Sequence, residues 1–119
     1  MKKIVFLTAI VSSALTLAAV YSLGYAALPT RVLLENARVR VKEVTYLPGV
    51  ARDRYIRPTD QIIVFLDDCK YQRTDSKTGE KLMRERKSGE VLWHDRSEDA
   101  PVLTNMGTAP YRTLTIELK

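Results

Sequence analysis

The sequence predicts an all-β domain, a sandwich or small barrel of antiparallel strands, preceded by an N-terminal apolar signal helix. After residue 26, short apolar or alternating runs are separated by turn residues about every eight to twelve positions, a spacing typical of such folds. No segment of that part carries a sustained helical period. At the N-terminus, by contrast, no charged side chain occurs between Ile4 and Thr30. The chain therefore divides into an apolar leader and one β domain.

The leader has the build of a secretory signal peptide, since Lys2 and Lys3 precede the apolar run and small residues end it. We predict a signal peptide over residues 1–26, cleaved after Ala26 or, as a second choice, after Gly24. The alternative is an uncleaved anchor, because about twenty apolar residues can cross a bilayer.

Both alternatives for the leader export residues 27–119, because positive charge before an apolar segment stays on the cytoplasmic side. We therefore expect a periplasmic or secreted domain, in contact with a membrane only through the leader if it is not cleaved.

Charge and cysteine content exclude several classes of protein. The formal net charge of the 119 residues is +5, and positive and negative side chains alternate along the domain, so we expect no nucleic-acid partner. Cys69 is the one cysteine, so no disulfide forms within the chain and no zinc site follows from thiolates. We expect this thiol to be a small buried apolar group.

The first strands are predicted from alternation. Residues 31–36 suit an edge strand, and "RVRVKEVTYL" at 38–47 alternates with Val39 and Val41 on one face. The phase then changes, which predicts a bulge near Val44, and Pro48-Gly49 ends the strand.

The middle of the domain is predicted as one buried strand and a hairpin. "QIIVFLDD" at 61–68 is apolar on both faces, so we expect a central strand between two packed layers. A turn with Gly79 at positive φ then joins two antiparallel strands, and Gly89 marks a second turn.

The C-terminal part predicts three more strands. "VLWH" and "PVLTN" are followed by a turn over 107–110 and by the alternating strand "YRTLTIEL". In that last strand we expect Leu114, Ile116 and Leu118 to face the core.

The order of these pieces resembles the cupin superfamily of small jelly-roll barrels. The similarity rests on "RVRVKEVTYLPG", the apolar "IIVFL" strand, the hairpin, "SGEVLW" and "NMGTAPYRTLTIEL", and it covers residues 31–119. It implies a cupin-like antiparallel jelly-roll barrel or sandwich over residues 27–119.

The resemblance also implies where a metal would bind. The superfamily uses three histidines and a glutamate, and counting from Gly49 puts Tyr55 and Arg57 at two histidine positions and Gln61 at the glutamate position. The third histidine position falls near 99–101, which holds no histidine. A guanidinium stays protonated and repels a cation, so we predict no metal and no cofactor.

A second set of side chains carries groups that could serve a metal or catalysis. His94, Asp95, Glu98, Asp99 and Asp60 carry suitable donors, but a single histidine next to "SED" is more typical of a solvated loop. One histidine without a positioned partner is no catalytic constellation, so no catalytic residue is assigned.

The pocket candidates are Tyr55, Arg57, Gln61, Trp93 and His94. Arginine and tyrosine at a barrel mouth can bind a small anionic or sugar ligand by charge-assisted hydrogen bonds. The competing interpretations are that Arg52, Arg54 and Arg57 form ion pairs with acids at the rim, and that Trp93 anchors the core.

The function predicted is an exported, non-enzymatic cupin-like domain that binds a small anionic ligand or an envelope partner. The alternative is a metal-dependent cupin-type enzyme, an isomerase, lyase or oxygenase, with atypical ligands. A third interpretation is a structural homodimer that pairs through an edge strand such as 31–36.

Overall fold

The computed structural model describes residues 28–119, so the predicted signal peptide or anchor lies outside the described residues. The described part forms strands and no helix, which confirms the all-β class, and none of it could cross a membrane as an apolar helix. The strands in chain order are β1 (Thr30–Glu35), β2 (Val39–Tyr46), β3 (Ala51–Arg52), β4 (Tyr55–Ile56), β5 (Asp60–Phe65), β6 (Cys69–Thr74), β7 (Lys81–Arg86), β8 (Val91–His94), β9 (Asp99–Ala100), β10 (Val102–Asn105) and β11 (Tyr111–Leu118).

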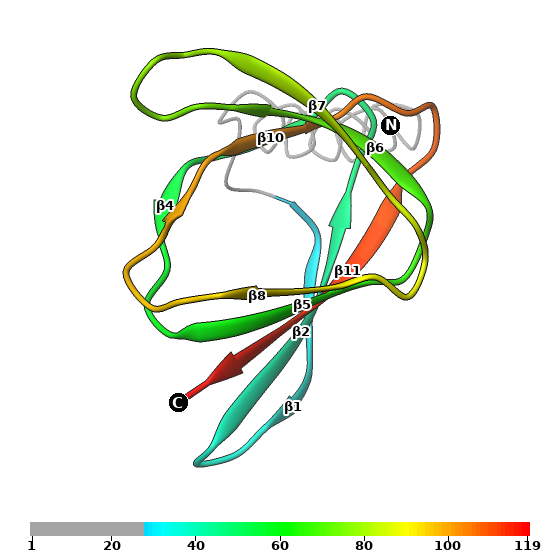
Figure 1. Cartoon of the computed structure of the whole chain (residues 1–119). Coiled ribbons are helices and arrows are strands. Elements are labelled where there is room, and N and C mark those ends of the chain that lie inside the picture. Colours follow the sequence, from blue (N-terminus) through cyan, green and yellow to red (C-terminus); the bar gives the residue numbers. More distant parts are fainter. Residues whose placement is uncertain (1–27) are drawn as a thin grey trace, which may run out of the picture.

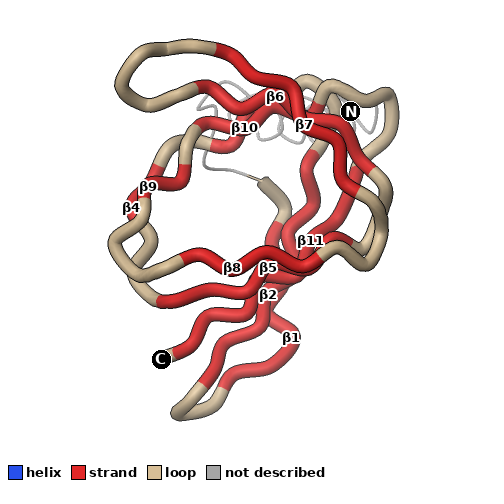
Figure 2. Tube along the Cα trace, in the orientation of Figure 1, coloured by secondary structure: helices blue, strands red, loops and turns tan. Residues whose placement is uncertain are grey.

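Two sheets and a short strand pair enclose a barrel (Figure 1). The larger sheet has the order β1-β2-β11-β5-β8 and the smaller one β3-β10-β6-β7, while β4 pairs with β9. All strand pairs are antiparallel. In Figure 2 the β4-β9 pair closes one side of the barrel, and the β1-β2 hairpin extends beyond its wall.

The predicted hairpin between β6 and β7 is confirmed. Its register runs from Cys69 opposite Arg86 to Thr74 opposite Lys81. Gly79 has a φ of 73°, a left-handed conformation that glycine adopts without steric cost.

The predicted bulge near Val44 is wrong. β2 pairs with β11 without interruption, from Tyr46 opposite Tyr111 to Val39 opposite Leu118. The irregularity lies in the edge strand β1, between Val32 and Leu34. The change of phase in the sequence has another cause, because β2 places apolar side chains on both of its faces.

The face assigned to the last strand is also wrong. In β11 the buried residues are Tyr111, Thr113, Thr115 and Glu117, whereas the leucine and isoleucine side chains alternate with them on the outer face, where they are half-buried. Tyr111 stacks on Tyr46 of β2 inside the barrel. This contact decides which face of β11 points to the lumen, because every second residue of a strand lies on the same side of the sheet.

Strand β5 is interior to its sheet, as predicted, with β11 on one side and β8 on the other. Gln61 and Phe65 are buried toward the barrel, and Ile62 and Val64 lie on the outer face, half-buried. The second packed layer that we expected is not found, since none of the strands in residues 28–119 packs over that face (Figure 2).

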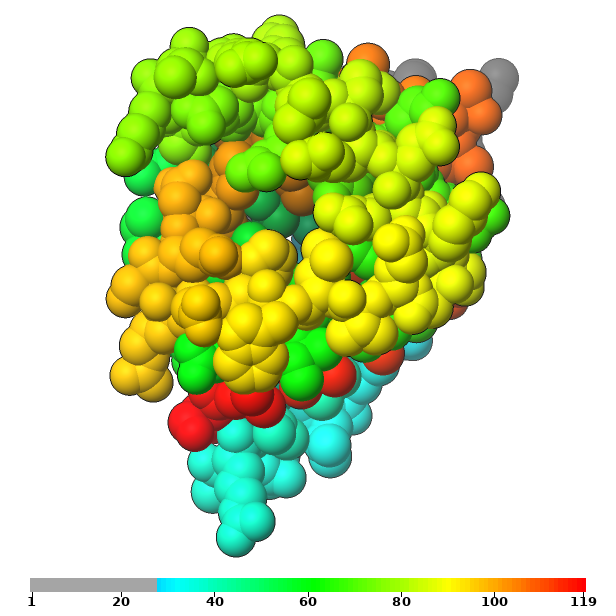
Figure 3. Space-filling model, in the orientation of Figure 1, coloured from blue at the N-terminus to red at the C-terminus, as the bar shows by residue number. Residues whose placement is uncertain are grey.

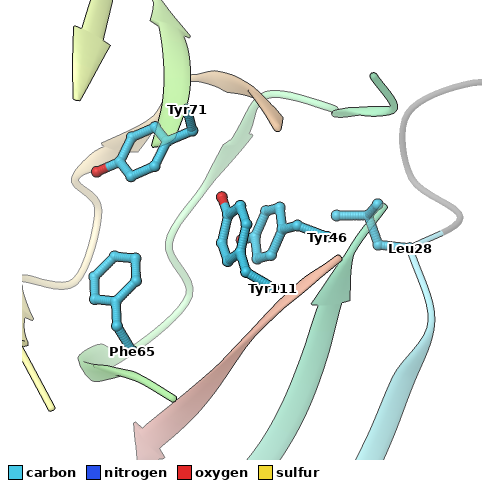
Figure 4. Packing of buried hydrophobic residues seen from close by; sticks show 5 residues of the cluster. All are labelled: Leu28, Tyr46, Phe65, Tyr71 and Tyr111. Atoms are coloured by element: carbon cyan, nitrogen blue, oxygen red, sulfur yellow. The ribbon is translucent and has the colours of Figure 1, made fainter. Parts of the chain in front are cut away.

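The buried core is mainly aromatic (Figure 4). Tyr46 and Tyr111 stack with ring centroids 4.7 Å apart, and Phe65 and Tyr71 stack at 6.3 Å. Leu28 covers the end of this cluster next to Tyr46. These four rings also line the lumen of the barrel, together with polar side chains.

Cys69 packs against this aromatic cluster as a partly buried side chain, in agreement with the expectation for a lone thiol. Burial raises the pKa of the thiol to about 11. Because the thiolate is the reactive form, Cys69 is a poor nucleophile at neutral pH.

Candidate functional site

The lumen of the barrel contains a small cavity bounded by both sheets and by the β3-β4 segment. About 60 Å³ of it admits water-sized groups. Figure 3 shows the surface hollowed at the centre of the barrel. The cavity is lined by Tyr46, Arg52, Tyr55, Arg57, Ile63, Phe65, Tyr71, Leu92, His94, Leu103, Tyr111, Thr113 and Thr115.

Arg57 reaches this cavity from the segment between β4 and β5, and only 5% of its surface is exposed. Its Nη1 atom donates to Oε1 of Gln61 at 2.9 Å and to the Tyr55 hydroxyl at 3.3 Å. Gln61, at the start of β5, is 1% exposed. Burial lowers the pKa of the Arg57 guanidinium, which nevertheless remains a cation at neutral pH.

Arg52 brings a second positive charge from β3. Its Nη1 atom donates to the Tyr46 hydroxyl at 3.2 Å, and Nη2 donates to the carbonyl oxygen of Pro101. The guanidiniums of Arg52 and Arg57 lie 5.3 and 5.6 Å from the centre of the Tyr55 ring, which is within cation–π range. Tyr55 therefore screens two cations that share one small space.

His94 and Glu98 stand at the mouth of the cavity. Nδ1 of His94 lies 2.5 Å from Oε2 of Glu98. Burial lowers the pKa of His94, and the charge of Arg57 lowers it further, although Glu98 opposes the shift. His94 is therefore neutral near pH 7.

The loop before β9 holds Glu98 in this position. Ser97 has a φ of 68°, a left-handed conformation uncommon for a residue with a side chain. The amide of Ser97 donates to the carbonyl oxygen of Arg57 at 2.8 Å. The amide of Arg57 in turn donates to the carbonyl oxygen of Glu98 at 3.1 Å. These bonds fasten the loop to the arginine segment and set the carboxylate beside the imidazole.

Several buried polar atoms around the cavity have no hydrogen-bond partner among the described residues. They are Nε of Arg52, Nε of Arg57, the Tyr111 hydroxyl and Oγ1 of Thr113. Nε of Arg57 lies 3.5 Å from the carboxylate of Glu98, which is an ion-pair contact but too long for a good hydrogen bond. Burial raises the pKa of Tyr111, so its hydroxyl remains a donor. Buried polar groups normally have partners, so these four atoms mark a place for a ligand or ordered water.

The interpretation that the arginines form ion pairs with acids at the rim is correct for two of the three. Nε of Arg54 lies 2.6 Å from Oδ1 of Asp99, and Arg57 contacts Glu98 as above. Arg52 forms no such ion pair within residues 28–119. The lumen therefore keeps an excess of positive charge.

The side chains of the lumen do not fit the set of three histidines and one glutamate with which cupins bind a metal. Tyr55, Arg57 and Gln61 occupy three of the implied ligand positions, and the guanidinium lies where a cation would be repelled. His94 and Glu98 offer two suitable donors. The part of the chain that the structure describes holds no group of three or more His, Cys, Asp or Glu side chains able to hold a metal ion.

The structure brings four of the five predicted pocket residues together. Tyr55, Arg57 and His94 line the cavity, and Gln61 lies behind Arg57 as its acceptor. Trp93 is on the opposite face of β8, 53% exposed, and its indole nitrogen donates to Asp95 at 2.8 Å. It contributes neither to the cavity nor to the core, so the expectation of a core anchor is wrong.

Sequence reasoning missed three residues of the site. Thr113 and Tyr111 were placed on the outer face because the leucine side of β11 was assigned to the core. Arg52 was considered only as one of three arginines that could form ion pairs at the rim. The sequence carried no clear signal for Arg52, because it is five residues from Arg57, an odd spacing that strict alternation would place on the opposite face, and the segment between β3 and β4 breaks that alternation.

Comparison with known proteins shows similarity at the level of the fold. No protein-family model and no curated protein matches the chain. A cupin domain from Bordetella pertussis Tohama I superposes with a TM-score of 0.68 at 16% identity, over 77% of this chain and 93% of its own.

Two further solved structures extend this similarity. An RmlC-like cupin family protein with a double-stranded β-helix fold from Methanocaldococcus jannaschii gives a TM-score of 0.60 at 8% identity, over 76% of this chain and 79% of its own. The polyketide cyclase RemF from Streptomyces resistomycificus gives a TM-score of 0.61 at 15% identity, over 75% of this chain and 63% of its own. At such identities the likeness concerns the fold and not the chemistry.

Proposed function

Because the described chain has the cupin fold, we propose that it is an exported, non-enzymatic binding domain whose lumen holds the oxyanion group of a small molecule. The observation that carries this proposal is the set of buried donors around the cavity that lack partners, two of them on the guanidiniums of Arg52 and Arg57. A carboxylate, sulfate or phosphate group supplies acceptors to all of them, and hydrogen bonds between ionised partners are about twice as strong as neutral ones.

The charge of the site favours an anion. Two guanidiniums face the cavity, and the nearest carboxylate, that of Glu98, is at the partly exposed mouth beside His94. The other partners of the guanidiniums are neutral oxygen atoms from Gln61, Tyr46, Tyr55 and Pro101. An anion would therefore neutralise charge that the folded chain itself leaves uncompensated.

The size of the site limits the ligand. About 60 Å³ of accessible space holds one oxyanion group, whereas drug-sized ligands occupy about 300–1,000 Å³. We therefore propose that the acidic group enters the lumen and the rest of the molecule lies at the mouth.

Thermal unfolding with and without sulfate tests this proposal. Sulfate stabilises most folded proteins through exclusion from their surface, so the informative quantity is the difference between variants. We expect sulfate at ten times its Kd to add about 1.4 kcal/mol of stability through the site, and Arg57→Met to lose that increment.

Arg38→Met is the matched control, since it removes an exposed arginine in the β1-β2 turn, far from the lumen. Sodium chloride at equal ionic strength corrects for screening. Equal sulfate increments in the wild type and in both variants would contradict the proposal.

Sulfate affinity is expected to rise as the pH falls below about 6.5, the ordinary pKa of histidine. Because burial and Arg57 lower the pKa of His94, the imidazole is neutral at pH 7 and gains its proton only in more acidic solution. An anion favours the protonated form, and by reciprocity protonation favours the anion. Calorimetric titration from pH 7.5 to pH 5 measures the trend, which His94→Asn should abolish; the same trend in that variant would refute the assignment.

An enzyme is the alternative, and one observation favours it: His94 and Glu98 form a hydrogen-bonded imidazole–carboxylate pair at the cavity. Such a pair can hold and move a proton or supply two ligands to a metal. Elemental analysis of the purified protein distinguishes the two functions. Transition metal at about one ion per chain, lost in His94→Asn, would support the enzyme.

Export forms the other part of the proposal, and it rests on the sequence of residues 1–26 alone. Mass spectrometry of the protein that cells accumulate, combined with fractionation, tests it. We expect a chain beginning at residue 27 outside the inner membrane. A full-length chain in the cytoplasmic fraction would refute export, and a full-length chain in the membrane fraction would support the anchor.

A further inference from the structure

A second hollow, larger than the lumen, lies outside its mouth. It has a volume of about 490 Å³, and it adjoins the lumen because Arg57 and His94 line both spaces. Its walls are the end of β6 with the β6-β7 turn on one side, and β9 with the loop that leads to it on the other. We name this hollow the mouth groove. The part of a ligand that stays outside the lumen would lie in it.

Hydrogen bonds hold the two walls of the mouth groove together. The carboxylate of Asp99 accepts from Nε of Arg54 at 2.6 Å and from the hydroxyl of Ser76, so it joins the β6-β7 turn to β9. Asp75 stabilises the turn itself by accepting from two backbone amides within it. The folded chain therefore forms the groove without help from a ligand.

Two cations of the mouth groove are available to an anionic group. Arg73, half-buried near the end of β6, and Lys77, in the β6-β7 turn, form no ion pair within residues 28–119. Of the acids that line the groove, Glu98 and Asp99 form ion pairs with other residues. The third acid, Asp75, forms an ion pair with neither cation. The charges of Arg73 and Lys77 are therefore not neutralised by a direct contact in the described part of the chain.

Strand register places Arg73 on the same face of the smaller sheet as Arg52. Both residues are opposite Leu103 of β10, from the strands on its two sides, and residues paired in this way share a face of the sheet. Arg52 and Leu103 line the lumen. With strands about 4.8 Å apart, the α-carbons of the two arginines lie roughly 10 Å from each other. One small molecule can therefore reach both guanidiniums.

The residues that line the lumen and the mouth groove carry an excess of positive charge. Near pH 7, with His94 neutral, they include five arginine and lysine side chains but three carboxylates. A ligand with a single acidic group leaves part of this excess uncompensated, whereas a ligand with two acidic groups balances it.

The carboxylates of the mouth groove favour hydroxyl groups between the two acidic groups. The hydrogen bonds to Asp75 use its Oδ1 atom, and the contacts of Glu98 use its Oε2 atom. The second oxygen atom of each carboxylate can therefore accept from a hydroxyl group of a ligand. A purely hydrocarbon chain would bring only methylene groups to these oxygen atoms.

We propose that the ligand is a small hydroxylated molecule with two acidic groups, the chemistry of a sugar diacid. One acidic group enters the lumen beside Arg52 and Arg57, and the second binds Arg73 and Lys77 in the mouth groove. The hydroxylated carbons between them lie along the groove carboxylates. This inference rests on the proposed anion site of the lumen, to which it adds a second site and a ligand class.

Isothermal titration with three acids of equal chain length tests the proposal, on the purified protein in the form that cells accumulate. Glucarate has two carboxylates and several hydroxyl groups, gluconate has one carboxylate, and adipate has two carboxylates without hydroxyl groups. We expect glucarate to bind about tenfold more tightly than gluconate, the gain from one further hydrogen bond between charged groups. We expect it to bind about fivefold more tightly than adipate, the gain from one hydrogen bond to a hydroxyl group. The titrations are made at about pH 5.5, where these carboxylates are ionised.

Sulfate, titrated in parallel, reports the lumen alone. The double variant Arg73→Met with Lys77→Met should bind glucarate no more tightly than gluconate, and its affinity for sulfate should stay within about twofold of the wild type because distant exposed charges are screened. Arg57→Met should lose the binding of sulfate and of all three acids.

Arg38→Met is again the control, since it removes a positive charge far from both spaces and should leave every affinity unchanged. Equal affinities for glucarate and gluconate in a wild type that binds sulfate would overturn this inference and leave the anion site of the lumen intact. Adipate bound as tightly as glucarate would overturn the role of the hydroxyl groups, and an unchanged preference for glucarate in the double variant would overturn the second site. Absence of binding by sulfate and by all three acids would overturn both proposals. Should the double variant fail to fold, the comparison of the acids in the wild type decides alone.

Discussion

Replacing Tyr111 by alanine is expected to lower the free energy of unfolding by about 3–5 kcal/mol, the usual cost of truncating a buried aromatic residue. Tyr111 is 2% exposed and stacks on Tyr46 with ring planes 6° apart. It also contacts Tyr71 at 6.4 Å between ring centres. Urea unfolding followed by circular dichroism measures the loss.

Tyr111→Phe is the matched control, because it keeps the ring and removes a buried hydroxyl that has no partner in residues 28–119. Removing an unsatisfied buried group is close to neutral or stabilising, so we expect a change within about 1 kcal/mol of the wild type. In sulfate, however, this variant should gain less stability than the wild type. A loss as large as that of the alanine variant would show that the hydroxyl has an essential partner within the protein.

Gln61→Leu is expected to lower the free energy of unfolding by about 2–3 kcal/mol, although leucine suits a buried site of this size. Gln61 is 1% exposed, and its Oε1 atom accepts from the Arg57 guanidinium at 2.9 Å. The substitution leaves a buried cation without its principal acceptor, and the cost arises from that cation. The same unfolding measurement applies.

The double variant Arg57→Met with Gln61→Leu should regain stability to within about 1 kcal/mol of the wild type. Replacing both members of a buried polar pair by apolar side chains is often neutral. The double-mutant cycle therefore isolates the Arg57–Gln61 interaction. Additive losses in the double variant would mean that the two side chains contribute independently and that the buried charge is not the reason for the cost.

The order of strands and turns could be predicted because it depends on local chemistry. Gly79 adopts the left-handed conformation that its turn requires, and alternation marks each strand wherever only one face is apolar. The similarity to cupins rested on that order, which explains why the fold was identified although none of the implied ligand residues is a histidine.

The orientation of the strands could not be predicted in the same way. Because the sheet is apolar on both faces, the pattern in β11 does not say whether Ile116 or Thr115 faces the lumen. The stacking of Tyr111 on Tyr46, residues far apart in sequence, decides this. Trp93 was misplaced for the same reason, since β8 also has apolar residues on both faces.

The candidate site was predicted where the residues are close in sequence. Tyr55, Arg57 and Gln61 fall within one turn-containing segment, and the structure joins them by hydrogen bonds. Arg52 and Tyr111 reach the cavity through contacts between the sheets, and such contacts leave no local pattern in a single sequence.

Isothermal titration of sulfate at pH 5.5 into the wild type and into the double variant Arg57→Met with Gln61→Leu tests the anion site most directly. Both chains are expected to be folded, so a difference between them reports the lumen and not stability. We predict saturable binding of one sulfate per chain to the wild type and none to the double variant. Equal heats for the two proteins, or no saturable binding to either, would contradict the account.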